Sequence, residues 1–294
     1  MIAAAIVLMQ FMISTRAGLV NYVEGQTNVY VHQQVLAGAP IQTGAQSHAE
    51  ILLNPGSFLR LDQNTSVVLD SAELTNIELH VVEGAVLIES VELDRQTPIR
   101  VNTGNLRTAI LSPGVYVFSG NTAAVIDGRL RTAGSSITVK KGHEVTAAGG
   151  RDEKGTLNPI TEFAALERWS QQRSLELARA NAAVSGDRAS ITSYTNSAWI
   201  YSPLFGGFTF LPLHSYRSYW GQRFVPGAAA AVPGPSGSTA QASPPAAASG
   251  APVVRPRPSP GGGAPVRGSS GRPSTGASRG HSGSAGHGGG HGHK

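Results

Sequence analysis

The sequence contains no cysteine in its 294 residues. This absence excludes a disulfide framework, a thiol nucleophile, and any zinc or iron–sulfur site that uses cysteine ligands. Charge is also scarce, because only 14% of the residues are Asp, Glu, Lys or Arg. Acidic residues end at Asp187, so residues 188–294 carry a net charge of +9 and residues 1–187 carry −4. The overall charge of +5 therefore describes neither half of the chain.

Bulky apolar residues are rare at the end of the chain. Residues 226–294 contain 17 Gly and 11 Pro, and most of the other positions are Ala or Ser. Such a segment cannot bury enough apolar surface to offset the entropy lost on folding, so we predict a disordered tail. Its arginines could hold an anionic polymer, but they predict no specific nucleic-acid site. Its last residues include four histidines that either bind Zn, Ni or Cu loosely or are filler in a linker: His281, His287, His291 and His293.

Long hydrophobic runs are missing as well. The most apolar stretch, residues 2–13, has twelve residues and one polar side chain, Gln10. A membrane-spanning helix needs about 20 apolar residues, so the sequence predicts no transmembrane helix. The stretch suits the core of a signal peptide, and we expect residues 1–17 to direct export to the periplasm or the medium. The alternative is a buried first strand.

Residues 18–149 are predicted to form one all-β domain. Short apolar alternations are interrupted by turn residues about every ten positions, which is typical of a roll, a sandwich or a β-solenoid. We expect a linker at residues 150–157, because it contains charged and small residues without a clear apolar pattern. Charged residues at outward strand positions predict an ordinary solvated face of mixed sign: Glu78, Glu89, Arg100 and Arg107.

One part of this domain carries an ordered series of residues between Leu36 and Leu69. The series is Thr43-Gly44, Ser47, Ala49, Leu53, Gly56-Ser57, Leu59-Arg60-Leu61 and Thr65. It resembles the FecR domain, named for the iron-dicitrate signalling regulator, and the resemblance implies an all-β roll or solenoid-like fold in which these residues have structural roles. Members that restrain a sigma factor have a cytoplasmic segment and a membrane helix before this domain. Here the domain starts near residue 18, so we expect that cytoplasmic segment to be lacking.

A helix and an aromatic arm follow the β domain. Within residues 158–184, apolar residues at helical spacing predict a helix from about Thr161 to Ala182 whose stripe packs on the β domain. The arm, residues 185–225, holds ten of the chain's 18 aromatic residues. It either covers an open face of the β domain or offers aromatic side chains to a partner. The candidate partner-binding residues are Trp199, Tyr201, Phe205, Phe208, Tyr219 and Trp220.

The function suggested by these features is non-catalytic. The sequence has no nucleophile elbow, zinc-protease motif, phosphate loop or dinucleotide fingerprint, so we predict neither an enzyme nor a bound cofactor. We expect an exported binding or scaffold module of the bacterial cell envelope, with a protein or a glycan as its partner. The alternative is a component of FecR-type transmembrane signalling linked to iron uptake, which the family resemblance implies.

Overall fold

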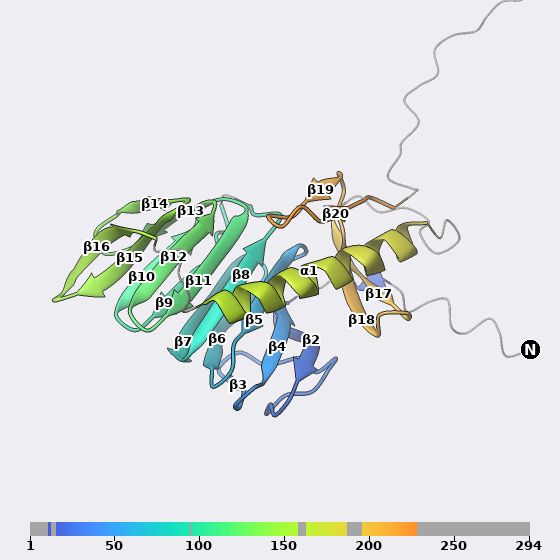
Figure 1. The fold of residues 1–294 in the computed structure, drawn as a ribbon, viewed down its shortest axis with the longest axis horizontal. Coiled ribbons are helices and arrows are strands. Elements are labelled where there is room, and N and C mark those ends of the chain that lie inside the picture. Colours follow the sequence, from blue (N-terminus) through green and yellow to red (C-terminus); the bar gives the residue numbers. More distant parts are fainter. Residues whose placement is uncertain (1–10, 13–15, 95, 158–162, 187–195, 228–294) are drawn as a thin grey trace, which may run out of the picture. The chain divides into compact units, whose positions relative to one another are not determined.

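The computed structural model describes residues 11–12, 16–94, 96–157, 163–186 and 196–227. Strands dominate this described part, and its one helix is α1 (Ala164–Ser185). Figure 1 shows the strands side by side, one after another along the long axis, with α1 crossing in front of them. The predicted all-β domain followed by one helix is confirmed. Most of the predicted signal peptide and nearly all of the predicted disordered tail lie outside the described residues.

Two large sheets form the β domain, and the strand order in each follows the sequence. The first sheet has seven strands: β3 (Pro40–Gln42), β6 (Ser66–Glu73), β7 (Asn76–Glu83), β9 (Arg100–Thr103), β10 (Leu106–Ile110), β13 (Arg129–Thr132) and β14 (Thr138–Lys140). The second sheet has eight: β2 (Leu19–Glu24), β4 (His48–Leu52), β5 (Ser57–Leu61), β8 (Ala85–Ser90), β11 (Gly114–Ser119), β12 (Thr122–Asp127), β15 (His143–Ala148) and β16 (Arg151–Thr156).

The chain moves from one sheet to the other after every one or two strands. Neighbouring strands are antiparallel, apart from the parallel pair β7 and β9. Because both sheets extend in the same sequence order, the domain grows in one direction from β2 and β3 towards β14 and β16. This progression is the feature it shares with a roll or a solenoid.

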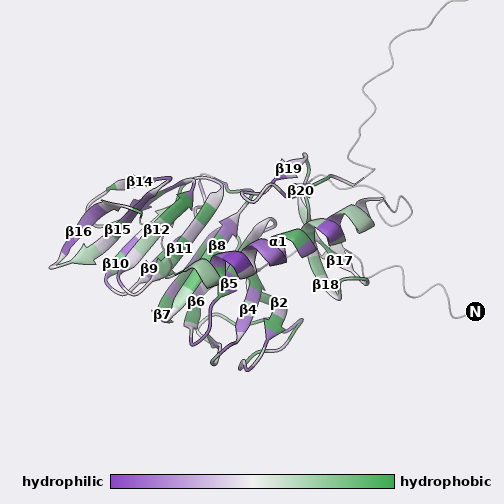
Figure 2. Ribbon diagram, viewed as in Figure 1, coloured by the Kyte–Doolittle hydropathy of each residue, from purple (hydrophilic) through white to green (hydrophobic). Residues whose placement is uncertain are grey.

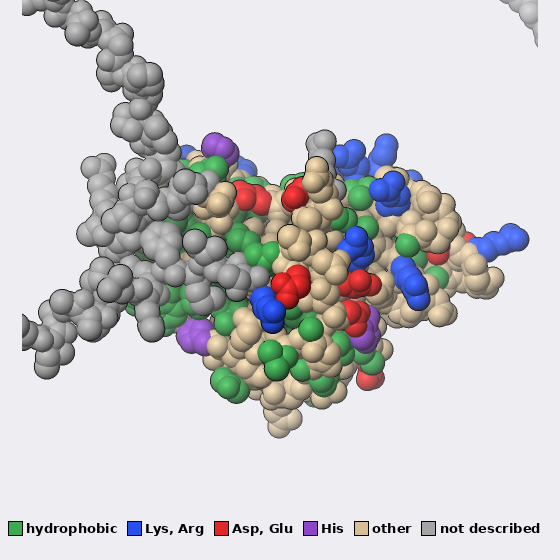
Figure 3. Space-filling model, turned by 180° about the vertical axis from the view of Figure 1, so that it is seen from behind, with side chains coloured by type: hydrophobic (Ala, Val, Ile, Leu, Met, Phe, Trp, Pro, Cys, Tyr) green, Lys and Arg blue, Asp and Glu red, His purple; other side chains and the backbone are tan. Residues whose placement is uncertain are grey.

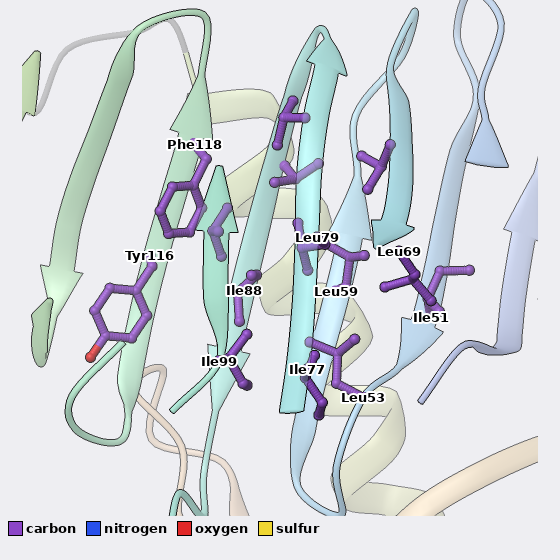
Figure 4. Close-up of a cluster of buried hydrophobic side chains, with 14 of the residues drawn as sticks. Ile51, Leu53, Leu59, Leu69, Ile77, Leu79, Ile88, Ile99, Tyr116 and Phe118 are labelled. Carbon is purple, nitrogen blue, oxygen red and sulfur yellow. The ribbon is translucent and has the colours of Figure 1, made fainter. Parts of the chain in front are cut away.

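An apolar core fills the space between the two sheets. Strands β6 and β7 alternate buried and more exposed residues, as expected for strands with one solvated face. In contrast, β5 and β8 are buried along their whole length, which requires cover on both faces. Figure 4 shows side chains of this core from both sheets: Ile51, Leu53, Leu59, Leu69, Ile77, Leu79, Ile88, Ile99, Tyr116 and Phe118.

The cover on the outer face of the eight-stranded sheet comes from the C-terminal part of the described chain. Strands β17 (Ala198–Ser202) and β18 (Gly207–Leu211) form a hairpin, and β1 (Phe11–Met12) pairs with β17. A second, small hairpin consists of β19 (Tyr216–Arg217) and β20 (Arg223–Phe224). We call α1 with these two hairpins the cap. The aromatic arm therefore packs on the β domain.

Strand β16 occupies the segment predicted to be a linker. It pairs with β15, so that Arg151 faces Ala148 at one end and Thr156 faces His143 at the other. The turn between the two strands contains Gly149 and Gly150, which have φ values of 56° and 78°. Two consecutive positive φ values suit the tight turn of a hairpin, and glycine adopts them at little cost. The strand is hydrophilic (Figure 2) because it is an exposed edge, where charge also discourages pairing with other chains. That exposure gives it the composition of a linker.

Helix α1 has a more polar buried face than its sequence spacing predicts. Leu166 and Leu177 are buried as expected, whereas Trp169 lies at the border and is half-buried. The remaining buried face includes five polar or charged residues: Ser170, Arg173, Ser174, Asn181 and Ser185. Within the described residues, no helix has the length and apolar character needed to span a membrane.

Candidate functional site

The cap is attached to the β domain by an aromatic cluster. Trp199 is fully buried, with its ring centroid 5.1 Å from Phe58 of β5 and 6.1 Å from Phe210 of β18. Gly56, at the turn before β5, has φ +86°, and a Cβ atom there would lie 2.9 Å from the Phe210 ring. Only glycine allows this approach. A turn residue of the FecR-like series thus makes room for the cap.

The six predicted partner-binding residues have different environments in the cap. Trp199 and Phe208 are buried, and Tyr201, Phe205 and Trp220 are half-buried. Tyr219 is 40% exposed. The first two therefore contribute to the packing of the cap, and a partner role remains a prediction for the accessible ones.

Four charged side chains are buried between the cap and the eight-stranded sheet, and we call them the buried ionic cluster. They are Glu50, Arg60, Glu89 and Arg173, from β4, β5, β8 and α1. Arg60 donates from Nε to Glu50 Oε2 at 2.9 Å and from Nη1 to Glu89 Oε2 at 2.8 Å. Arg173 donates from Nη2 to Glu50 Oε1 at 3.0 Å. Two carboxylates and two guanidinium groups neutralise one another away from water.

Aromatic rings enclose the two arginines. The Cζ atom of Arg173 lies 3.9 Å from the ring centroid of Tyr22 and 4.9 Å from that of Phe205. The Cζ atom of Arg60 lies 5.2 Å from the Phe58 centroid and 5.8 Å from the Trp220 centroid. Such contacts stabilise a guanidinium group where little water reaches it. Aromatic residues of the arm therefore shield the ionic cluster.

The two glutamates of the cluster have pKa values shifted in opposite directions. Burial is the largest influence on Glu50 and raises its pKa, but attraction to Arg173 and Arg60 outweighs it, so the net pKa is lowered. Burial is also the largest influence on Glu89, and Arg60 is its one arginine partner, so its net pKa is raised. The second arginine explains the difference.

Residues far apart in the sequence complete the attachment. Asn21 of β2 donates to Glu50 Oε1 at 2.9 Å and to the Phe208 carbonyl at 2.9 Å, and it accepts from the Phe208 amide at 2.7 Å. Asn181 of α1 donates to the Phe210 carbonyl and accepts from the Val225 amide. Both side chains satisfy backbone groups that would otherwise be buried without partners.

The first turns of α1 are held by a third set of contacts. Trp169 stacks on His48 of β4, with ring centroids 4.7 Å apart and planes inclined by 16°. Its Nε1 donates to Glu24 Oε2 at 3.0 Å, and His48 Nε2 lies 3.2 Å from Asp62 Oδ1. The helix is therefore fixed to the sheet at its start as well as at its centre.

The interpretation of Glu89 as a solvated outward residue is wrong. Glu89 does point away from the inter-sheet core, but α1 covers that face, so the residue is 1% exposed. Glu78, Arg100 and Arg107 do lie on a solvated face. The sequence contains two signals for the cluster: Arg60 lies in an otherwise apolar strand, and Arg173 continues the helical spacing of Trp169 and Leu177. Glu50 and Asn21 carry no such signal.

Residues 39–143 match the model of the family described as FecR protein. This segment is a FecR domain. The match begins at β3 and ends at the start of β15. It includes three members of the ionic cluster and excludes Arg173. Without the cap, the FecR domain would hold two of the cluster's carboxylates and one of its arginines. Helix α1 adds Arg173, which also donates to Glu176 of the same helix at 2.6 Å.

Comparison with solved structures gives weak similarity over part of the chain. Two crystal structures of a "putative anti-sigma factor" from Parabacteroides distasonis ATCC 8503 match with 15% and 14% sequence identity and a TM-score of 0.37 each. Each match covers 45% of this chain and 64% or 65% of the other chain, which is less than two thirds of its length. No curated protein matches the chain.

Exposed apolar side chains lie in the turn between β17 and β18 and in the turn at residues 30–33, and a ring contact connects the two segments. Leu204 is 90% exposed and Tyr30 is 70% exposed. His32 joins the two segments, because its ring centroid lies 5.6 Å from that of Tyr201. Phe205 and Leu204 also line a groove of about 270 Å³ against α1. We call Tyr30, His32, Tyr201, Leu204 and Phe205 the tip patch.

The predicted metal-binding histidines at positions 281, 287, 291 and 293 lie outside the described residues. In the part of the chain that the structure describes, no group of three or more His, Asp or Glu side chains could hold a metal ion. The charged groups of the ionic cluster are enclosed on all sides. Their arrangement joins two layers of the protein.

Proposed function

We propose that the protein is a non-catalytic, exported binding module of the cell envelope that contacts a protein partner through the tip patch. The observation that carries this proposal is that part of the patch belongs to a hairpin whose buried side chains pack on the FecR domain. Tyr201 and Leu204 are accessible, while Trp199, Phe208 and Phe210 of the same hairpin are buried against the FecR domain. A rigid support lowers the entropy lost on binding.

The composition of the patch favours a protein over a glycan. Leu204, its most exposed side chain, is aliphatic, and of its Tyr and Phe rings only that of Tyr30 is exposed, while the rings of Tyr201 and Phe205, which could stack on sugars, are half-buried. Accessible apolar side chains beside a groove can mark an interaction site, and tyrosine is enriched at interaction hot spots.

A crosslinking experiment tests the proposal. A photoreactive residue in place of Leu204, in the full chain expressed in the bacterium that encodes it, should capture a defined envelope protein. Binding of that purified protein should then weaken by about tenfold in Tyr30→Ser/Leu204→Ser, equivalent to about 1.4 kcal/mol. Val82→Ser is the matched control, because Val82 is 59% exposed on β7, away from the patch. Equal binding by both variants contradicts the proposal.

Signalling is the second candidate, and the FecR match at residues 39–143 supports it. In that case the captured partner belongs to a transmembrane signalling system, and loss of the protein changes the transcription that the system controls. A reporter for sigma-factor-dependent transcription distinguishes the two candidates. A scaffold module leaves the reporter unchanged when the gene is deleted, whereas a signalling component alters it.

A further inference from the structure

The outer face of the seven-stranded sheet separates charge by strand. Strands β6 and β7 carry four acidic residues and no Lys or Arg: Asp70, Glu73, Glu78 and Glu83. Strands β9, β10, β13 and β14 carry five basic residues and no acidic one: Arg100, Arg107, Arg129, Arg131 and Lys140. We call these five residues the basic face. Figure 3, viewed from the side opposite α1, shows Lys and Arg side chains gathered towards one end.

All five cations point to solvent. Along each strand they alternate with buried residues such as Val101, Leu106 and Leu130, so they share the outer face, and each is exposed. The register places Arg100 and Arg131 on either side of Ala109. Since neighbouring strands lie about 4.8 Å apart, these two residues are roughly 10 Å apart at the backbone. The cations form an array across four strands.

Four of the five cations lack a compensating charge, whereas Arg100 lies opposite Glu78 of β7. Arg129 and Lys140 are directly opposite each other on β13 and β14, and like charges in that position destabilise a sheet. Among the described residues, no carboxylate forms an ion pair with Arg107, Arg129, Arg131 or Lys140. An array of this kind attracts anions and gains stability when one binds.

We propose that the basic face binds a linear anionic polysaccharide. An extended polyanion can follow such an array and contact several cations at once, which a small anion cannot do. The face offers no aromatic ring for stacking on nucleotide bases, because the described strands β9, β10, β13 and β14 contain none. It also lacks an apolar side chain to enter a bilayer: Val82 is the one exposed large hydrophobic residue on this sheet, and it lies on the acidic strand β7.

This site is separate from the tip patch, so the proposal does not depend on the proposed protein partner. The cap covers the eight-stranded sheet, whereas the basic face belongs to the seven-stranded sheet on the other side of the core. A polysaccharide on one side and a protein on the other could be held together by one chain. Such a bridge would give the FecR domain a second binding function.

The test measures binding of the full-length protein to a fluorescent heparin decasaccharide between about 50 and 200 mM sodium chloride. Arg129→Gln/Arg131→Gln should weaken binding by about tenfold and lower the slope of log affinity against log salt by about two, one for each cation removed. The matched control is Arg217→Gln/Arg223→Gln, which removes the same charge from exposed positions on β19 and β20 of the cap. Both variants keep the basic tail.

The outcomes separate a site from general electrostatic attraction. A loss confined to the Arg129/Arg131 variant supports the basic face. Equal losses in the two variants, or no loss in the first, overturn the proposal. Tighter binding of a duplex DNA of about 20 base pairs, through the same two arginines, would overturn the choice of polysaccharide and assign the face to nucleic acid. Unchanged thermal unfolding of both variants shows that the comparison concerns binding alone.

Discussion

Between the two sheets of the β domain, aliphatic and aromatic side chains make the buried contacts, whereas the interface between the eight-stranded sheet and the cap also encloses four charged groups. The first interface depends on volume and shape, and hydrophobic residues of similar size can substitute for one another in such a core. The second depends on each charge having its partner. A buried ion pair adds little net stability, but the loss of one member is costly. The cap should therefore be the more selective of the two interfaces.

The largest expected fall in stability follows the removal of Arg60. Arg60→Met keeps most of the side-chain volume but leaves Glu50 with one arginine and Glu89 with none. We expect the free energy of unfolding, measured in urea at pH 7, to fall by about 3–5 kcal/mol. Arg60→Lys keeps the charge and should lose less. A fall below about 1 kcal/mol in Arg60→Met would mean that water reaches the cluster.

A cavity in the inter-sheet core is the corresponding test of the other interface. Leu79→Ala removes a fully buried side chain of β7 and should cost about 2–5 kcal/mol. Because no charged group is involved, this loss should be the same at pH 7 and pH 5. The loss in Arg60→Met should shrink over that range as Glu89 takes up a proton. A similar pH dependence in both variants would contradict the distinction between the interfaces.

The amide bridge between the cap and β2 gives an intermediate effect. Asn21→Ala leaves the Phe208 amide and carbonyl without their side-chain partner and removes one hydrogen bond from Glu50. We expect a loss of about 1–3 kcal/mol in chemical denaturation. Asn102→Ala is the control, because Asn102 makes one partly exposed hydrogen bond, to Glu78, and its loss should stay within about 0.5 kcal/mol. Equal losses would show that the bridge adds nothing.

The opposite pKa shifts predict a stability curve with two parts. The lowered pKa of Glu50 provides stability above the ordinary value of 4.5, and this stability is lost as the pH falls through the lowered folded pKa. The raised pKa of Glu89 acts in the other direction, and its contribution grows as the pH falls from the raised folded pKa towards 4.5. Urea midpoints across this range should thus hold or rise before they fall. Glu89→Gln should remove the change in stability at higher pH and keep the fall in stability at lower pH. An unchanged curve would refute the assignment of these changes to Glu89 and Glu50.

The smallest expected effect has the reverse sign and concerns the surface. Lys140→Gln removes a like charge opposite Arg129 and should stabilise the protein by about 0.2–1 kcal/mol, measured as an increase in Tm. Lys154→Gln, on the exposed edge strand β16, should have no such benefit. A gain in stability together with weaker heparin binding would indicate that the basic face is kept for binding. A destabilised Lys140→Gln protein would show that the charge is compensated.

Local patterns were enough to predict the β domain, its FecR resemblance and the presence of a helix. The alternation of buried and exposed residues in strands such as β6 and β7 depends on neighbours in the sequence, and so do the turn residues between the strands. The sequence also contained the anomaly at Arg60. It did not reveal the partners of Arg60, because Glu50 and Glu89 are 10 and 29 positions away and no local rule pairs them with it. Arg173, which joins the cluster through Glu50, is 123 positions from that residue.

Composition misled the prediction where exposure and disorder look alike. The segment that forms β16 was predicted to be a linker because its residues are mostly charged or small. An exposed edge strand has the same composition, because it buries little apolar surface and is held by hydrogen bonds to its partner strand. In the same way, Glu89 was assigned to solvent because strand alternation shows which face a residue occupies but not what covers that face. The charged face of the seven-stranded sheet appeared mixed until the strand order separated its signs.

The sequence by itself determined the fold class, the turn positions and the uneven distribution of charge, because each depends on local conformation or composition. The tertiary structure decided which charges are buried together, which aromatic residues remain accessible and how the surface cations are grouped. Those properties arise when strands and a helix distant in the chain come within a few ångströms, where desolvation and Coulomb interactions become strong.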